Sequence, residues 1–219
     1  MAFSRVAGIL LHPTSLPGSG GIGTLGEHAR RFVDTLERSG IGLWQVLPLG
    51  PTGYGDSPYS ALSAFAGNPF LIALEPLVER GWLKETDLTR LPQSPSEAVN
   101  FGDLVPAKMA VLRLAFDRFD VHQEAEYHHF LGENAGWLDD FCLYMAIKDA
   151  YGGEPWSRWP PDLRSRDAAA LTAQCRDLAT EIDFHRFVQF TFFDQWSALK
   201  QYANQRNVQI VGDIPIFVA

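Results

Sequence analysis

Two short apolar runs separated by an amphipathic helix constrain the fold of this chain most. Residues 6–12 (Val-Ala-Gly-Ile-Leu-Leu-His) and 43–47 (Leu-Trp-Gln-Val-Leu) are almost continuously apolar, which is typical of parallel strands covered on both faces. Between them, three apolar residues recur at helical spacing: Phe32, Val33 and Leu36. Parallel strands need a crossover of this kind, whereas antiparallel strands can be joined by a tight turn. We therefore expect an α/β fold.

The rest of the chain predicts a run of helices and then a third strand. Helices are expected at residues 105–119, 122–131 and 137–150, separated by breaks that contain Pro or Gly. A further helix at 184–204 groups five residues on one side: Phe187, Val188, Thr191, Gln195 and Leu199. Residues 208–213 then predict the third strand. This order predicts three regions: 1–81 with two strands and their loops, 82–182 as a helical insertion subdomain, and 183–219 with a helix and the third strand.

Composition and charge exclude several classes of partner. With 219 residues, 46% of them hydrophobic, the chain can bury a substantial core. Its formal net charge of -8 would repel a phosphate backbone, so we expect no nucleic acid partner. No run approaches the roughly 20 apolar residues that cross a bilayer, and Cys142 and Cys175 do not make a disulfide framework. We expect a cytoplasmic protein without a membrane partner, and the sequence leaves its oligomeric state open.

A glycine pattern in the first loop offers a rival interpretation. Gly21, Gly23 and Gly26 match G-x-G-x-x-G, which in dinucleotide-binding folds lets the backbone approach a pyrophosphate. In such folds the first glycine follows the strand directly, whereas two prolines intervene here between His12 and Gly21. The acidic residue expected about 20 residues later is also missing, because residues 41–51 contain no Asp or Glu. We expect no cofactor and no metal.

A long loop rich in Gly, Pro, Ser and Tyr follows the second predicted strand. Residues 47–69 (LPLGPTGYGDSPYSALSAFAGNP) hold Tyr54, Ser57 and Tyr59 on one segment that is too long for an ordinary connection. A pyranose has an apolar face that stacks on an aromatic ring and hydroxyl groups that need hydrogen bonds. Tyrosines and a serine therefore suit a sugar site. The alternative, that both tyrosines only pin the loop to the core, is equally compatible with the spacing.

Four segments together resemble a known family. They are residues 12–18 (His-Pro-Thr-Ser-Leu-Pro-Gly), residues 47–69, the helix with Gln189 and Gln195-Trp196, and residues 212–219 (Gly-Asp-Ile-Pro-Ile-Phe-Val-Ala). In content and order they resemble the amylomaltase group of 4-alpha-glucanotransferases, glycoside hydrolase family 77. The resemblance covers both ends of the chain and is weak over the helical insertion.

The resemblance implies a fold that this chain would only begin. It implies the N-terminal part of a (β/α)8 TIM barrel of the alpha-amylase type, with an inserted helical subdomain. Such a barrel needs eight strands and about 250 residues, and only three strands are predicted before Ala219. The nucleophile and the acid/base are therefore expected after residue 219, and we expect the isolated chain to be inactive.

The resemblance also implies a reaction and a set of binding residues. The reaction is transfer of alpha-1,4-glucan segments between maltooligosaccharides by a retaining double displacement. The substrate-binding residues implied are Tyr59, Asp213, Ser57, Tyr54, His12 and Pro13. Tyr59 would be a sugar platform near the cleaved bond, and Asp213 would hold the sugar in the donor subsite. Tyr54 would contact a more remote glucan site, with Phe101 as a further aromatic there.

Two other functions stay open. One is a noncatalytic glucan-binding or helical interaction module, and the other is an alpha-glucan hydrolase. Ile-Pro-Ile-Phe follows Asp213, where ordinary amylases have an Asn-His pair after the equivalent aspartate, and this departure favours a transferase over a hydrolase. By its position alone, Asp213 could instead cap the turn that follows the third strand.

Overall fold

The computed structural model describes residues 5–53, 55–92, 98–122 and 125–218. Contacts between residues divide the chain into two compact units. The first unit joins residues 1–119 to residues 191–219, and the second comprises residues 120–190. The helical insertion predicted for residues 82–182 stays a prediction.

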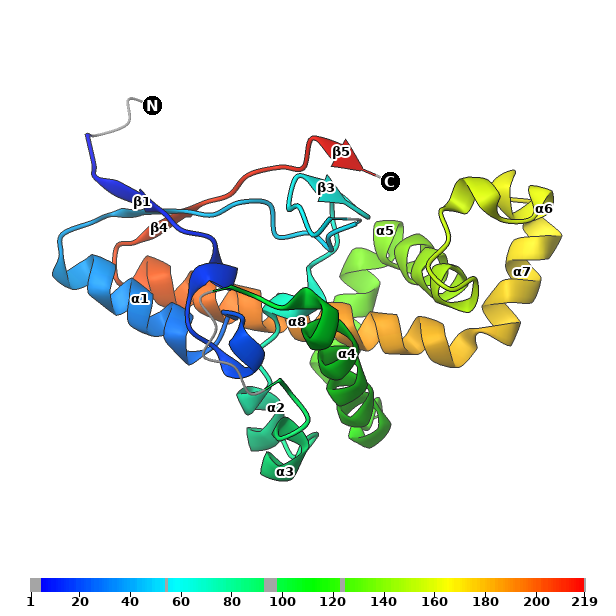
Figure 1. Ribbon diagram of the computed structural model, residues 1–219, viewed down its shortest axis with the longest axis horizontal. Coiled ribbons are helices and arrows are strands. Elements are labelled where there is room, and N and C mark those ends of the chain that lie inside the picture. Colours follow the sequence, from blue (N-terminus) through cyan, green and yellow to red (C-terminus); the bar gives the residue numbers. More distant parts are fainter. Residues whose placement is uncertain (1–4, 54, 93–97, 123–124, 219) are drawn as a thin grey trace. The chain divides into compact units, whose positions relative to one another are not determined.

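A parallel three-stranded sheet organises the first unit (Figure 1). Its strands are β1 (Gly8–Leu10), β2 (Leu43–Gln45) and β4 (Gln209–Val211), in the order β1-β2-β4. The register pairs Gly8 with Leu43, and Leu43 with Gln209. The predicted α/β fold with three parallel strands is confirmed, and each strand is shorter than its apolar run.

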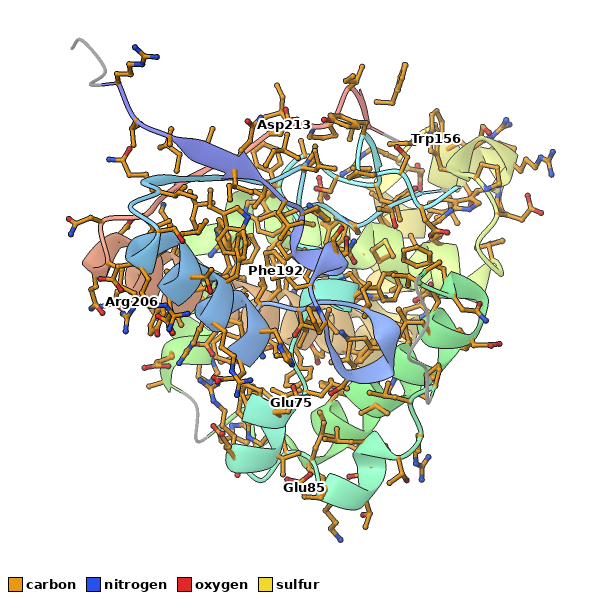
Figure 2. All side chains as sticks on the ribbon, turned by 60° about the vertical axis from the view of Figure 1, so that its left-hand side comes forward. Glu75, Glu85, Trp156, Phe192, Arg206 and Asp213 are labelled. Atoms are coloured by element: carbon orange, nitrogen blue, oxygen red, sulfur yellow. The ribbon has the colours of Figure 1, made fainter. Side chains whose placement is uncertain are left out.

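Two crossover helices lie along one face of these strands (Figure 1). They are α1 (Glu27–Arg38) and the C-terminal half of α8 (Ala179–Gln205). Trp44 of β2 is fully buried, packs edge-on against Phe32 at 5.0 Å between ring centroids, and donates from Nε1 to the carbonyl of Leu11 at 2.7 Å. Arg206, seen against α1 in Figure 2, pairs with Asp34 at 2.9 Å. Aromatic packing therefore holds α1 against β2, and an ion pair joins α1 to the residue that follows α8.

The opposite face of the sheet corrects one expectation. The apolar run at residues 6–12 is expected to be covered on both faces, yet Leu10, on the face away from Trp44, is 56% exposed. Ile9 shares the face of Trp44 but lies in the edge strand β1, and it is 37% exposed. In β4, at the opposite edge of the sheet, Val211 is 41% exposed. Double cover of a parallel strand requires a second layer of structure, and the described residues supply one layer only.

The remaining elements of the first unit are short, except for the 18-residue helix α4. They are η1 (Pro13–Ser15), η2 (Ser19–Gly21), β3 (Ser60–Ala61), η3 (Pro69–Leu71), α2 (Glu75–Glu79), α3 (Glu85–Leu88), α4 (Phe101–Arg118) and β5 (Phe217–Val218). β3 and β5 pair in parallel as a second, two-stranded sheet. The loop at residues 50–69 lies close on α8, because an ideal Cβ at Gly67 would be 2.0 Å from Cδ1 of Phe192.

Helices joined by short turns make up the described residues of the second unit. It contains α5 (Ala125–Ala150), η4 (Trp156–Arg158), α6 (Pro161–Arg164), α7 (Ala168–Asp177) and the start of α8. The predicted break between helices at 122–131 and 137–150 is wrong, because α5 is continuous. Gly132 and Gly136 sit inside it without close neighbours, and a glycine costs a helix only about 1 kcal/mol relative to alanine. Among the described residues, no helix has the length and apolar character needed to span a bilayer.

Candidate functional site

Tyr59 and Asp213 meet beyond the carboxyl ends of the sheet strands. Asp213 lies two residues after β4, and Tyr59 immediately precedes β3. The Tyr59 hydroxyl donates to Oδ2 of Asp213 at 2.9 Å. The Tyr59 carbonyl also accepts the N–H groups of Ile216 at 3.1 Å and Phe217 at 3.0 Å. The loop after β2 and the segment after β4 are thus joined through one tyrosine, at the end of the sheet where barrel enzymes place their chemistry.

The hydrogen bond to Asp213 favours the protonated form of the Tyr59 hydroxyl. Its hydrogen bond to the Asp213 carboxylate raises the pKa of Tyr59 above the ordinary value, so the phenol stays protonated at neutral pH. The other carboxylate oxygen, Oδ1, accepts the N–H of Ile214 at 2.8 Å. Asp213 therefore accepts one hydrogen bond from the backbone of the next residue and another from Tyr59. Each carboxylate oxygen can accept a further hydrogen bond, so an exposed carboxylate beside an aromatic ring suits a sugar.

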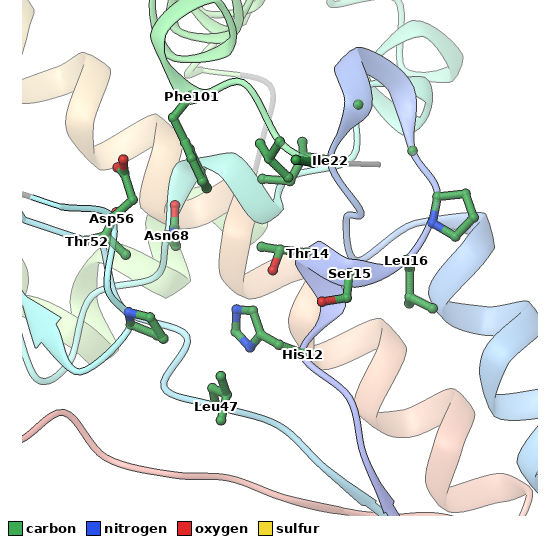
Figure 3. Close-up of a pocket in the computed structure, with 16 residues that line it drawn as sticks. His12, Thr14, Ser15, Leu16, Ile22, Leu47, Thr52, Asp56, Asn68 and Phe101 are labelled. Carbon is green, nitrogen blue, oxygen red and sulfur yellow. The ribbon is translucent and has the colours of Figure 1, made fainter. Parts of the chain in front are cut away.

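A pocket of about 810 Å³ opens beside the same loop (Figure 3). This volume falls within the usual range for ligand pockets. Its polar lining includes His12, Thr14, Thr52, Asp56 and Asn68, and Phe101 provides an aromatic surface. Figure 3 shows Phe101 and His12 pointing into the pocket from opposite sides.

His12 supplies a neutral polar group to the pocket. It follows β1 and stands at the start of η1, where its carbonyl accepts the N–H of Ser15 at 2.9 Å. Burial lowers its pKa to about 4, so the imidazole is uncharged at neutral pH. Within the described part of the chain, its Nδ1 atom is buried without a hydrogen-bond partner. A buried polar atom without a partner is uncommon in folded proteins.

Glycines let the first loop fold back against η1 and form a wall of the pocket. An ideal Cβ at Gly18 would be 2.0 Å from the carbonyl oxygen of Ile22, and one at Gly23 would be 2.0 Å from that of Pro13. The N–H of Gly23 donates to the Thr14 carbonyl at 3.1 Å. Close backbone packing therefore accounts for these glycines without a phosphate. Among the described residues, no group of three His, Cys, Asp or Glu side chains could hold a metal ion.

The predicted site residues divide between two places, the Tyr59–Asp213 pair and the pocket. Tyr59 and Asp213 form one pair, whereas His12 lies in the pocket. Ser57 is exposed, and its carbonyl accepts the N–H of Ser60. Pro13 is buried and opens η1, so it supports the pocket from behind. Tyr54 lies outside the described residues.

Sequence reasoning missed several residues that line the pocket. Thr14, Asp56 and Asn68 were not singled out, although Phe101 was. Asn68 caps η3, since its Oδ1 accepts the N–H of Phe70 at 2.9 Å. An Asn directly before a proline is a common start of a helical turn, so this signal was present in the sequence. Nothing local marks Thr14 or Asp56, because their roles depend on contacts distant in sequence.

Comparisons with known proteins agree along the whole chain. Residues 11–219 match the family model described as 4-alpha-glucanotransferase. The 4-alpha-glucanotransferase of Thermus thermophilus is 49% identical over 223 residues, covering 100% of this chain and 44% of that protein. The Synechocystis 4-alpha-glucanotransferase is 44% identical, with the same coverage. The amylomaltase from Streptococcus agalactiae, solved in complex with acarbose, superposes with a TM-score of 0.93 at 37% identity, covering 99% of this chain and 44% of that one. The chain thus spans less than half the length of these relatives.

Proposed function

Because the chain belongs to glycoside hydrolase family 77, the 4-alpha-glucanotransferases, we propose that the protein carrying it transfers alpha-1,4-glucan segments between maltooligosaccharides. The observation that carries this proposal within the chain is the Tyr59–Asp213 hydrogen bond of 2.9 Å beyond the strand ends. It couples an aromatic ring to a carboxylate. A sugar ring can stack on the first while its hydroxyls donate to the second.

In this proposal the pair binds the sugar and does not cleave the bond. Cleavage with retention needs a nucleophilic carboxylate and a protonated acid about 5 to 5.5 Å apart. We expect both groups from the part of the family's length that lies beyond the matched 44%. Asp213 would hold the donor sugar by charge-assisted hydrogen bonds while its ring distorts.

The pocket lined by His12 and Phe101 would hold a second part of the glucan. Phe101 offers a stacking face, and neutral His12 can donate to or accept from a hydroxyl. Ser57 belongs to the loop that borders both places, so a chain passing from one to the other would run along this loop. We propose that Tyr54, three residues earlier in the sequence, contacts the same glucan. Holding an acceptor sugar there favours transfer, because the acceptor hydroxyl must outcompete water.

We also place the protein in the cytoplasm. Cys142 is buried and Cys175 is exposed, and both are free thiols. Burial raises the pKa of the Cys142 thiol to about 12, so this sulfur stays protonated and unreactive. Free thiols are typical of a reducing compartment.

Incubating the full-length protein with maltotriose tests this function. We expect glucose together with oligosaccharides longer than maltotriose, while the total number of reducing ends stays constant. A steady rise in reducing ends would identify a hydrolase instead. Saturable glucan binding with no change in the oligosaccharides would identify a noncatalytic module.

A further inference from the structure

Lys108 is a buried lysine on the helix that carries Phe101. It is 1% exposed, and its Nζ donates to the carbonyl oxygen of Phe70 at 2.6 Å. Burying an amine that is charged in water costs free energy unless its hydrogen bonds compensate. A methionine would fill similar space without this cost. The specific contribution of a lysine here is therefore its contact with the Phe70 carbonyl.

The Phe70 carbonyl depends on Lys108 because the neighbouring backbone is bonded elsewhere. Continuing the 3-10 turn of η3 would direct the N–H of Ala73 to this carbonyl. That N–H instead donates to Oε1 of Gln195 at 2.7 Å, and Nε2 of Gln195 donates back to the Ala73 carbonyl at 2.8 Å. Segment 68–73 is thus held from two sides, by Lys108 of α4 and by Gln195 of α8.

One face of α4 supports three parts of the pocket. Phe101, Leu104 and Lys108 are spaced by three and four residues, so they follow one another along the same side of the helix. Phe101 lines the pocket. Leu104 supports the wall at residues 18–22, since its Cδ1 would be 3.1 Å from an ideal Cβ at Gly20. Lys108 binds the segment that begins with Asn68, another residue of the pocket lining.

We infer that Lys108 is a positioning residue of this pocket: by holding the Phe70 carbonyl it fixes Asn68 relative to Phe101, and so sets the space available to a glucan. The inference rests on the proposed function for its ligand class. Lys108 does not line the pocket and acts through the backbone of residues 68–70. Its loss should therefore weaken glucan binding more than it slows the chemical step.

The titration of Lys108 adds a pH dependence to this role. Burial lowers its pKa to about 7, and the charge of Glu75 on α2 opposes that shift. Two turns that pack against α4, η2 (Ser-Gly-Gly) and η3 (Pro-Phe-Leu), carry no charged side chain. The charge that α3 brings to this helix, Asp87, pairs with Arg118 near the end of α4. His12 in the pocket is neutral above a pH of about 4. Between pH 10.5 and about 7, a released lysine binds a proton that the buried amine does not. Opening of the contact should therefore become easier as the pH falls from 10.5 towards 7.

Kinetics of the full-length protein with maltoheptaose test the inference. Lys108→Met keeps the length and apolar stem but removes the donor, and Leu112→Met is the control, since Leu112 is equally buried one turn later on α4. We expect Lys108→Met to raise KM about 5- to 10-fold at pH 8, the effect of one lost hydrogen bond, with kcat within about twofold. The wild-type KM should rise from pH 9 to pH 7, and this rise should be absent in Lys108→Met. Leu112→Met should keep the wild-type KM and pH profile.

Amide hydrogen exchange provides a readout that needs no activity. Exchange in residues 68–73 should be faster in Lys108→Met than in the wild type, and unchanged in Leu112→Met. Equal loss of kcat in both variants, or unchanged exchange and KM in Lys108→Met, would overturn the inference. If the wild type does not transfer glucans but Lys108→Met still loosens residues 68–73 and weakens maltoheptaose binding in a titration, the proposed function fails and the positioning role stands.

Discussion

Tyr59 is restrained at both its ends, and this matters for any ligand that stacks on it. Asp213 holds its hydroxyl, and two backbone N–H groups hold its carbonyl. A ring fixed in this way loses little conformational entropy when a sugar binds. The hydrogen bond from Tyr59 also orients the Asp213 carboxylate. We therefore expect the ring and the carboxylate to act as one binding unit.

Substitutions at this pair should reduce transfer in a definite order. We expect Asp213→Ala and Tyr59→Ala each to lower kcat/KM of the full-length protein by about 10- to 100-fold, the range for a hydrogen bond to a charged group. Tyr59→Phe should cost less, because it keeps the stacking ring. Tyr151→Ala, at an exposed tyrosine of the second unit, is the control for tyrosine removal. Wild-type rates in Asp213→Ala or Tyr59→Ala would remove that residue from the site.

His12 should make the stability of the protein depend on pH. Its pKa is lowered from 6.5 to about 4 in the folded protein, so between these values the unfolded chain binds a proton that the folded chain does not. Folding is therefore destabilised as pH falls from 6.5 to 4, by up to about 3 kcal/mol.

Urea unfolding at several pH values measures this contribution. In His12→Gln the free energy of unfolding should fall less steeply between pH 6.5 and pH 4 than in the wild type. His28→Gln, at an exposed histidine on α1, should keep the wild-type slope. Parallel slopes in all three proteins would show that His12 titrates normally.

Among the elements, those defined by local pattern could be predicted from sequence, and those defined by distant partners could not. The strands around Ile9, Trp44 and Ile210 were predicted because apolar runs and a crossover helix specify them. β3 and β5 were missed because Ser60 and Phe217 pair across most of the chain, and neither two-residue segment carries a strand pattern. The same limit holds at the site. Sequence placed Asp213 at a strand end, but its contact with Tyr59 depends on that distant pairing.

Replacement by alanine should have opposite effects on stability at Gly67, in the loop before η3, and at Gly136, inside α5. Gly67→Ala should destabilise the protein by about 1–3 kcal/mol, because the new Cβ meets the ring of Phe192. Gly136→Ala should stabilise it by about 0.5–1 kcal/mol, because this position in α5 is open and alanine favours a helix. Urea unfolding at neutral pH measures both changes.

A double-mutant cycle identifies the cause at Gly67. If the clash with the ring is responsible, Gly67→Ala and Phe192→Leu together should cost less than the sum of the two single changes. Strict additivity would show that Phe192 is not what restricts position 67.

At the scale of the whole molecule, the residues that we propose to bind sugar lie in a chain that covers 44% of the Thermus thermophilus relative, and we expect the catalytic pair in the remaining part. We therefore expect the purified 219-residue chain to show no disproportionation of maltotriose. Chromatography of the products measures this, with the full-length protein as the positive control. Glucose and maltopentaose formed by the chain alone, at a rate that Asp213→Ala abolishes, would contradict the expectation.

The pairing of β3 with β5 has a consequence for motion during a reaction cycle. It joins the loop after β2 to the segment after β4, beside the hydrogen bonds that Tyr59 makes to Asp213, Ile216 and Phe217. A ligand that displaces this loop should therefore also displace Asp213. The Tyr59 ring and the Asp213 carboxylate would then move together and keep their contacts with a sugar while it enters or leaves.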